Sequence, residues 1–298
     1  MMAGTREPQT PLSGKRTVTM PSPTPAPDLK AQLTLVRNLA LEAGRILLAN
    51  FDQVGTVNRK RATELVTDLD GRVEEMLLES LQIHFPADRV LAEETGEYAG
   101  GSGRTWYIDP LDGTTNYAHG LPTFSVSIAC SDAQGLQLGC VYAPYLDEMY
   151  LATQGGGALL ERPGHDTRRT IGTTRIEAVE DALLATGFPY ERDQKVDLAT
   201  GLVNTFLKRR CHGVRRAGSA AVDLAHVAAG KLDGYWELNL RPWDTAAGIL
   251  LAREAGALVT DFAGEDIALP HESIIAASPA LHRQMLAVIA PAWREVGP

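Results

Sequence analysis

The sequence has few cysteines and no long hydrophobic run. Of its 298 residues only three are cysteines, Cys130, Cys140 and Cys211, an odd number set far apart in apolar surroundings. Such cysteines are typical of reduced core residues, so neither a disulfide framework nor a zinc site is indicated. No stretch reaches the ~18 apolar residues of a membrane span, and the N-terminus lacks the apolar core of a signal peptide. We therefore expect a cytoplasmic protein that does not enter membranes.

The sequence also lacks an excess of basic residues and two common catalytic motifs. Its formal net charge is −9, which argues against a nucleic-acid surface as the main function. There is no GxSxG nucleophile motif and no GxxxxGK[ST] phosphate loop, so serine hydrolases and nucleotide kinases are disfavoured. His119 has no cysteine or serine partner nearby, and we expect it to be structural. Gly155-Gly156-Gly157 predicts a tight turn between strands.

What is present is the composition of an ordinary globular protein, 44% apolar and 22% charged. Residues 1–27 hold six of the 17 prolines and no apolar periodicity, which predicts a disordered tail. We expect an N-terminal α+β half over 28–163 and a C-terminal α/β half over 170–298. The polar segment from Pro163 to Arg169 is interpreted as a hinge between them.

Periodicity predicts helices before and after an antiparallel sheet. Asp28 is the expected N-cap of the first helix, which should end near Asn50. Alternation of helices and strands in the second half favours layered α/β packing. The predicted helices are 28–50, 67–84, 198–209, 220–229, 244–255 and 281–289, and the predicted strands are 106–108, 124–130, 136–142, 149–152, 235–238, 257–259 and 274–277.

One stretch organises the chain, from Trp106 to Tyr117. An apolar strand delivers Asp109 at its end, and Pro110 is expected to stop the strand because proline cannot donate a ladder hydrogen bond. Asp112 follows close enough for two carboxylates to converge outside the sheet. The next residues, Gly113-Thr114-Thr115, should present backbone N–H groups as a helix start does. Divalent cations beside such N–H groups would form a phosphate site, although an Asp-rich turn before a capped helix is an equally ordinary interpretation.

Other acids also stand at the ends of predicted elements. Glu64 precedes the second helix, Glu93 and Glu94 follow the apolar pair Val90-Leu91, and Asp244 follows Trp243 at a helix start. Taken alone, each has a plain explanation, as a surface acid, a loop charge or a helix cap.

Taken together, three segments resemble the signature motifs of the inositol monophosphatase family. They are Leu91 to Gly96, the DPxDGT-type run from Asp109 to Asn116, and the WDxAAG-type run from Trp243 to Gly248. The run from Glu64 to Asp70 is similar to a fourth motif, with Glu64 in the position of the usual aspartate. The resemblance extends over residues 29–298, and the second and third motifs are highly specific together.

The resemblance implies a magnesium-dependent phosphomonoesterase with a five-layered αβαβα sandwich of the sugar phosphatase type. It implies two to three Mg²⁺ ions, a choice that agrees with the preference of this ion for oxygen ligands. A water oriented by Glu93 and the Thr114 hydroxyl would attack phosphorus, with Asp109 shared between two ions. Backbone N–H groups of Gly113 and Thr114 would bind the phosphate. The implied metal ligands are Glu93, Asp109, the Leu111 carbonyl, Asp112, Asp244 and, for the third ion, Glu64.

Substrate contacts are implied in the second half of the chain. The run from Arg216 to Ala221 resembles a family loop that approaches the substrate, which assigns Gly218, Ser219 and Ala220 to binding. Ser219 can also serve as a helix N-cap. Glu237 matches the acid that accepts hydrogen bonds from polyol hydroxyls, and Arg241 resembles the bacterial members.

The leading hypothesis is hydrolysis of inositol 1-phosphate. Alternatives in the same superfamily are fructose 1,6-bisphosphate, histidinol phosphate and adenosine 3′,5′-bisphosphate. A non-enzymatic alternative is a regulatory partner of the transcription machinery. The resemblance also implies a homodimer and inhibition by lithium.

Overall fold

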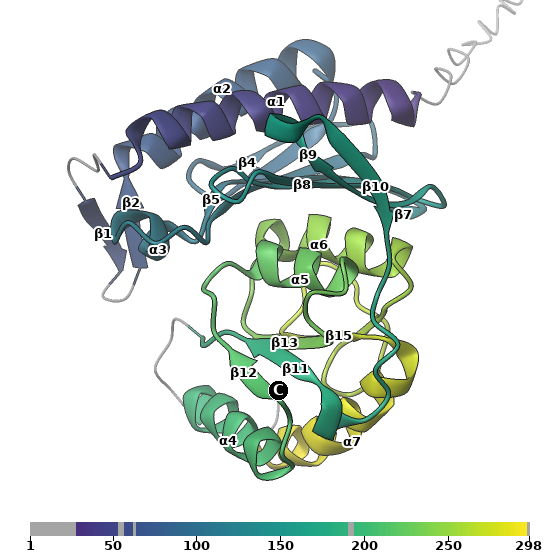
Figure 1. Ribbon diagram of the computed structural model, residues 1–298. Coiled ribbons are helices and arrows are strands. Elements are labelled where there is room, and N and C mark those ends of the chain that lie inside the picture. The colour runs from purple at the N-terminus through teal and green to yellow at the C-terminus, as the bar shows by residue number, and fades with distance from the viewer. Residues whose placement is uncertain (1–27, 53–56, 62–63, 190–193, 297–298) are drawn as a thin grey trace, which may run out of the picture.

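Figure 1 shows the computed structural model of the chain, which describes residues 28–52, 57–61, 64–189 and 194–296. The predicted Pro-rich tail, residues 1–27, and the side chain of Glu64 lie outside the described residues. None of the helices within these ranges combines the length and apolar character that a membrane crossing requires.

Seven α-helices occur in the described ranges. The first begins at the N-cap Asp28, whose carboxylate accepts a hydrogen bond from Lys30 N at 3.0 Å, as predicted. Its residues Val36, Ala40 and Leu47 are fully buried because they recur at helical spacing on one face. The helices are α1 Leu29–Asn50, α2 Asp68–His84, α3 Thr114–Ala118, α4 Gln194–Lys208, α5 Ala220–Ala228, α6 Pro242–Glu254 and α7 Pro279–Val296.

The strands form two large sheets and a separate two-stranded ribbon. The eight-stranded sheet has the order β10-β9-β8-β7-β6-β5-β3-β4, and the five-stranded sheet has the order β12-β11-β13-β15-β14. The first sheet is antiparallel except where β3 and β5 run parallel. The strands are β1 Val57–Arg61, β2 Glu64–Thr67, β3 Arg89–Ala92, β4 Gly96–Tyr98, β5 Thr105–Asp112, β6 Ser125–Asp132, β7 Gly135–Ala143, β8 Glu148–Thr153, β9 Gly157–Arg162, β10 Thr167–Ile171, β11 Leu183–Thr186, β12 Gly213–Arg215, β13 Gly234–Leu238, β14 Leu258–Thr260 and β15 Ser273–Ala277.

Five layers result, and they confirm the αβαβα arrangement. Helices α1 and α2 cover the outer face of the eight-stranded sheet, α5 and α6 lie between the two sheets, and α4 and α7 cover the far face of the second sheet (Figure 1). Four apolar clusters fill the four spaces between layers. A layer that contacts others on both faces must be apolar on both, and α6 accordingly buries eight consecutive residues from Thr245 to Ala252.

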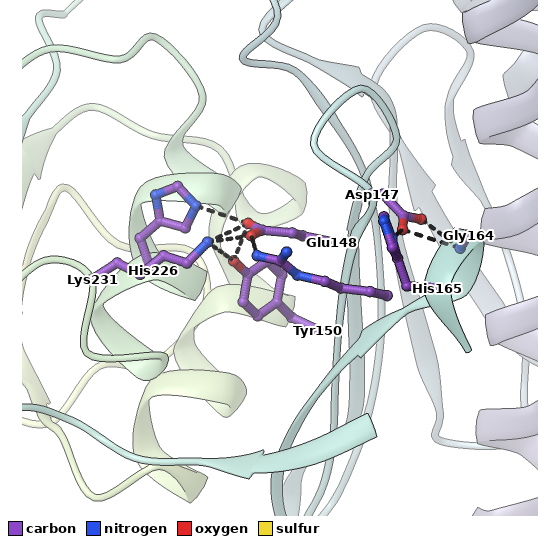
Figure 2. A network of polar contacts seen from close by, with 8 residues as sticks. Asp147, Glu148, Tyr150, Gly164, His165, His226 and Lys231 are labelled. Atoms are coloured by element: carbon purple, nitrogen blue, oxygen red, sulfur yellow. Dashed lines mark hydrogen bonds and ion pairs between the residues drawn. The ribbon is translucent and has the colours of Figure 1, made fainter. Parts of the chain in front are cut away.

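A buried polar network joins the first sheet to the middle helix layer. Glu148, on β8, accepts hydrogen bonds from Lys231 Nζ at 2.5 Å and from Tyr150 Oη at 2.7 Å. His226, on α5, lies 3.5 Å from the same carboxylate. Figure 2 shows these side chains converging on Glu148. Because Lys231 and His226 belong to the second half of the chain, the network links the two halves away from the acids described below.

Strand β5 differs from its prediction. It continues past Pro110 to Asp112 instead of stopping, with Asp109 opposite Ser127 and Asp112 opposite Ser125 on β6. One extra residue is therefore accommodated in β5 as a bulge, the position in a sheet where a residue without an N–H group is tolerated. The expectation that proline ends the strand was wrong, but the interruption of the ladder at that point was correct.

The predicted hinge at Pro163–Arg169 was also wrong. The chain makes a short 3₁₀ turn at Pro163–His165 and then returns as β10, which pairs with β9 in antiparallel register. Strand β10 lies at the edge of the sheet. Four of its five residues are polar and exposed, and only Ile171 is buried. Edge strands commonly carry charged residues, and a polar composition therefore does not distinguish an edge strand from a loop.

Candidate active site

All of the predicted site residues whose side chains are described line one cavity of about 1120 Å³. The cavity lies where β5, α5 and α6 meet, so it is built by both halves of the chain. The predicted residues in its wall are Glu93, Asp109, Leu111, Asp112, Gly113, Thr114, Gly218, Ser219, Ala220, Glu237, Arg241 and Asp244. Glu64 begins strand β2, and its side chain is outside the described residues.

The β5 bulge places Asp109 and Asp112 at the cavity. Asp109 is only 2% exposed, and its carboxylate accepts a hydrogen bond from the backbone N–H of Leu111 at 3.0 Å. This turn holds the chain so that Asp109 and Asp112, three residues apart, both reach the same cavity. A regular strand would alternate its side chains between the two faces and turn one of them away, so the bulge is what makes the pair possible.

Asp112 is held by the N-terminus of α5. Its Oδ2 atom accepts a hydrogen bond from Ser219 Oγ at 2.6 Å and another from Ala221 N at 2.8 Å. Ser219 is also the N-cap of α5, as predicted, with its oxygen accepting from Val222 N. A helix N-terminus favours a negative charge, so this arrangement stabilises Asp112 as a carboxylate.

The acids Glu93 and Asp244 come from two further elements. Glu93 follows the last residue of β3, and its backbone N–H donates to Ile108 O at 3.2 Å. Asp244 lies in the first turn of α6, where its Oδ2 accepts from Arg241 N at 2.8 Å. It is therefore the third helical residue of a capping arrangement and not the N-cap itself.

The turn at Gly113 and Thr114 lines the cavity beside these acids. Gly113 has a φ of 94°, and a Cβ there would lie 2.9 Å from Thr123 O, so both conformation and space require glycine. The Thr114 hydroxyl is 3.0 Å from Leu111 O and 3.2 Å from Asp70 Oδ1. Its orientation is thus set by a buried acid of α2.

Mutual repulsion and burial shape the electrostatics of the acids. Burial raises the pKa of Asp109 well above its usual range, and the neighbouring charges of Glu93, Asp112 and Asp244 raise it further. Burial likewise raises the pKa of Asp244, and it raises that of Asp112 to about 6 against the hydrogen bonds from α5. Several buried carboxylates that repel one another are stable as anions only when cations offset their charge.

The donor set fits Mg²⁺, although the described residues form no preformed cage. Within the described ranges no three acidic, histidine or cysteine side chains are already arranged around a single metal position. Mg²⁺ commonly keeps several waters and takes only one or two carboxylates together with substrate oxygens. An open cluster of carboxylates beside a peptide carbonyl therefore suits Mg²⁺ better than an ion that needs a full protein cage.

Glu237, on β13 of the second sheet, lines the cavity. Tyr235 donates a hydrogen bond to Glu237 Oε2, and the carboxylate packs directly on Gly187, where a Cβ would collide with it. Burial raises the pKa of Glu237 to about 7. Gly218, with a φ of 92°, brings its loop against Asn116, whose amide donates to Ala217 O at 2.7 Å.

Sequence reasoning gave no role to two acids on α2, Asp70 at the end of the fourth motif and Glu74 beyond it. Asp70 contacts the Thr114 hydroxyl, and Glu74 accepts hydrogen bonds from Glu94 N and Thr95 N, both at 2.8 Å. Both acids are fully buried. A usable signal was present, because Asp70 and Glu74 recur in phase with Val73 and Leu77 on the buried stripe of the helix. Acids on an apolar stripe are rarely surface residues.

Comparisons with known proteins show which family the chain belongs to. The model of the inositol monophosphatase family matches residues 28–297. The chain belongs to this family. A relative from Pseudomonas aeruginosa, named Nus factor SuhB, is 37% identical over 270 residues that cover 88% of this chain and 97% of the relative.

Solved structures of the inositol monophosphatase family show the same fold. The extragenic suppressor protein suhB from Bartonella henselae matches with a TM-score of 0.81 at 34% identity, covering 87% of this chain and 98% of that one. An inositol monophosphatase from Anabaena matches with a TM-score of 0.76 at 36% identity, covering 88% and 96%. The five-layered architecture is therefore the architecture of this family.

Proposed function

We propose that this member of the inositol monophosphatase family is a Mg²⁺-dependent phosphomonoester hydrolase. One observation carries the proposal. Acids from three separate elements, Glu93, the β5 pair and Asp244, line the same cavity as the Gly113-Thr114 turn. Carboxylates beside backbone N–H groups form a site for a phosphate only when cations accompany it, and the family is generally magnesium-dependent.

The site would hold two to three Mg²⁺ ions. Their ligands would be Glu93, Asp109, the Leu111 carbonyl, Asp112 and Asp244, with Glu64 near the third ion. When bound, Mg²⁺ supplies charge neutralisation at the phosphoryl oxygens and lowers the pKa of water. Asp109 would be the central ligand because it is the most enclosed of these four acids and interacts with the charges of the other three. The hydrogen bonds from Ser219 and Ala221 fix the orientation of Asp112.

Different groups of the protein would have different roles in the reaction. Glu93 and the Thr114 hydroxyl would orient the attacking water, with Asp70 holding that hydroxyl in place. The N–H groups of Gly113 and Thr114 would bind the phosphate oxygens as negative charge spreads over them. The departing alcohol lies toward Glu237, on the second sheet, and Gly218, Ser219, Ala220 and Arg241 complete that wall.

The substrate we propose is inositol 1-phosphate. Glu237 supports it, because a carboxylate fixed by Tyr235 is an acceptor for polyol hydroxyls. The test is a side-by-side measurement of phosphate release from inositol 1-phosphate, fructose 1,6-bisphosphate, histidinol phosphate and adenosine 3′,5′-bisphosphate, with and without Mg²⁺. Faster Mg²⁺-dependent release from another ester would keep the reaction and replace the substrate. The homodimer and the lithium inhibition implied by the resemblance stay predictions.

A second candidate function is a regulatory partnership with the transcription machinery. The names of several relatives favour it, including Nus factor SuhB from Escherichia coli at 38% identity over 258 residues. The variant Asp109→Ala, which removes the central acid, distinguishes the two functions. Binding to transcription complexes that survives in this variant, together with an absence of phosphatase activity in the wild type, would favour the regulatory function.

A further inference from the structure

Glu74 is a fully buried acid on α2 to which the proposed reaction gives no role. Acidic side chains are rarely buried without partners, and Glu74 has two from another part of the chain. Its Oε2 atom accepts a hydrogen bond from Glu94 N and its Oε1 atom accepts one from Thr95 N, both at 2.8 Å. One carboxylate therefore holds two consecutive backbone N–H groups.

The two N–H groups belong to the turn between β3 and β4. Ala92 pairs with Gly96 across this turn, and Gly96 has a φ of 85°, a conformation that glycine adopts without strain. Successive N–H groups that point to one side of a turn form a concave site for negatively charged groups. Because the carboxylate of Glu74 fills that site, the shape of the turn over residues 93–95 depends on α2 as well as on its own residues.

The first residue of this turn is Glu93, which lines the cavity. Its backbone N–H donates to Ile108 O at 3.2 Å, so this end of the turn is fixed to β5, the strand that carries Asp109. Glu74 fixes the next two residues of the turn. The charge of Glu93 acts on both Asp109 and Asp244. The direction of the Glu93 side chain relative to the other acids thus depends on two anchors, and only one of them lies on the strand.

Helix α2 suits the second anchor because close packing holds it in place. Val73 and Leu77, which neighbour Glu74 on the buried face of the helix, are both fully buried. A helix packed in this way cannot shift without displacing the core around it. Asp70, one turn before Glu74, contacts the Thr114 hydroxyl. The same helix therefore supports both segments that the proposed reaction assigns to orienting the attacking water.

We propose that Glu74 is a positioning residue for metal binding, which directs Glu93 toward the other acids through the backbone of the 93–95 turn. This inference rests on the proposed function, because that function assigns Glu93 to the Mg²⁺ site. Glu74 acts through Glu93 and touches neither the metal nor the substrate. Groups that orient a metal ligand commonly contribute about 10- to 100-fold to metal affinity.

Metal binding by two glutamine variants tests the proposal. Glu74→Gln keeps nearly the same shape, but its amide turns an NH₂ group toward one of the two backbone N–H donors, so one hydrogen bond is lost. The dissociation constant for Mn²⁺, which takes the same oxygen ligands as Mg²⁺, is measured from the electron paramagnetic resonance of the free ion. It should rise by about 10-fold or more.

Glu75→Gln is the matched control for this measurement. Glu75 is the neighbouring acid on α2, and it is exposed. Its loss should change the Mn²⁺ dissociation constant by less than about 2-fold, because salt screens exposed charges. A purely structural role for Glu74 predicts instead a lower Tm with wild-type Mn²⁺ affinity in the folded variant, and that result overturns the proposal.

Hydrogen exchange shows whether the effect passes through the turn. An amide must lose its hydrogen bond to exchange, so the amides of Glu94 and Thr95 should exchange faster in Glu74→Gln and at the wild-type rate in Glu75→Gln. The wild type provides a test that needs no variant. Coupling between two sites is reciprocal, so addition of Mg²⁺ should slow exchange at the same two amides. Exchange that Mg²⁺ leaves unchanged at both amides overturns the proposal.

The proposed function and this proposal fail in different ways. A wild type that binds Mn²⁺ but releases no phosphate from inositol 1-phosphate contradicts the function, and the Mn²⁺ affinities of the two variants still decide the role of Glu74. An active wild type whose Glu74→Gln variant keeps full Mn²⁺ affinity overturns the role of Glu74 alone. A wild type that binds no Mn²⁺ overturns both.

Discussion

Ser219 Oγ donates a hydrogen bond of 2.6 Å to Asp112 Oδ2, which joins the end of β5 in the first sheet to the start of α5 between the sheets. Ser125 Oγ lies 3.4 Å from the same Ser219 oxygen. Ser219 and Asp112 are 107 positions apart in the chain. The candidate active site therefore depends on both halves of the protein being packed together, and Ser219 is the side chain through which one half orients an acid of the other.

Ser219→Ala should weaken metal binding more than it weakens the fold. Loss of a group that orients a metal ligand typically costs 10–100-fold in affinity, so the Mg²⁺ concentration for half-maximal activity should rise by about 10-fold. Loss of the helix cap should cost about 1 kcal/mol of stability. Asp28→Ala is the control, because it removes only the cap of α1. An unchanged Mg²⁺ dependence in Ser219→Ala would show that the contact does not orient Asp112.

Glu148→Ala should strongly destabilise the protein. Although burial opposes ionisation, hydrogen bonds from His226, Lys231 and Tyr150 hold the pKa of Glu148 well below its usual range. Removing the acid leaves Lys231 with its partner gone at a partly buried site (Figure 2). Breaking such a pair from one side commonly costs ~3–5 kcal/mol, which urea denaturation would measure.

The neighbouring residue provides the control for Glu148. Asp147 accepts hydrogen bonds from Gly164 N and contacts His165 at the surface, also shown in Figure 2. Asp147→Asn should cost no more than about 1 kcal/mol, because exposed ion pairs contribute little. Equal losses in the two variants would mean that the Glu148 network does not join the layers.

Acid should destabilise the fold through buried histidines. Burial lowers the pKa of His282 to about 4, and its Nε2 lies 2.9 Å from Thr260 Oγ1. The unfolded chain takes up this proton near pH 6.5. Stability is therefore complete above about pH 6.5 and falls as the pH decreases toward 4, by about 2 kcal/mol at pH 5.

The pH dependence of unfolding in His282→Leu tests this assignment. The variant should lose part of the decrease in unfolding free energy between pH 7 and pH 5, whatever its stability at pH 7. His84→Gln, at an exposed position at the end of α2, should keep the full decrease. A wild-type slope in His282→Leu would assign the effect elsewhere, for which His271 is the next candidate because burial also lowers its pKa to about 4.

Local patterns were enough to predict the parts of the structure that depend on neighbouring residues. The N-cap Asp28, the stripe of α1 and the boundaries of α2 follow from helical periodicity, and the structure reproduces them. The acids at element ends could be placed in one site because the family motifs related them, and the cavity contains each of those whose side chains are described.

Features that depend on tertiary packing could not be predicted. Strand β11, Leu183–Thr186, is too short an apolar run to identify, and it becomes a strand because β12 and β13 pair with it on both sides. The bulge that carries β5 past Pro110 is set by its pairing with β6. Asp223 on α5 and Glu237 on β13 likewise line one cavity only because α5 packs on the second sheet.

The central claim is that the acids of this cavity hold Mg²⁺ for phosphomonoester hydrolysis. The most direct measurement is phosphate release from inositol 1-phosphate by the wild type and by Asp109→Asn, each with and without Mg²⁺. We expect release only from the wild type with Mg²⁺, because Asp109→Asn removes the charge at the centre of the acid cluster at nearly constant shape. Near-normal release from Asp109→Asn, or release by the wild type without Mg²⁺, would contradict the account.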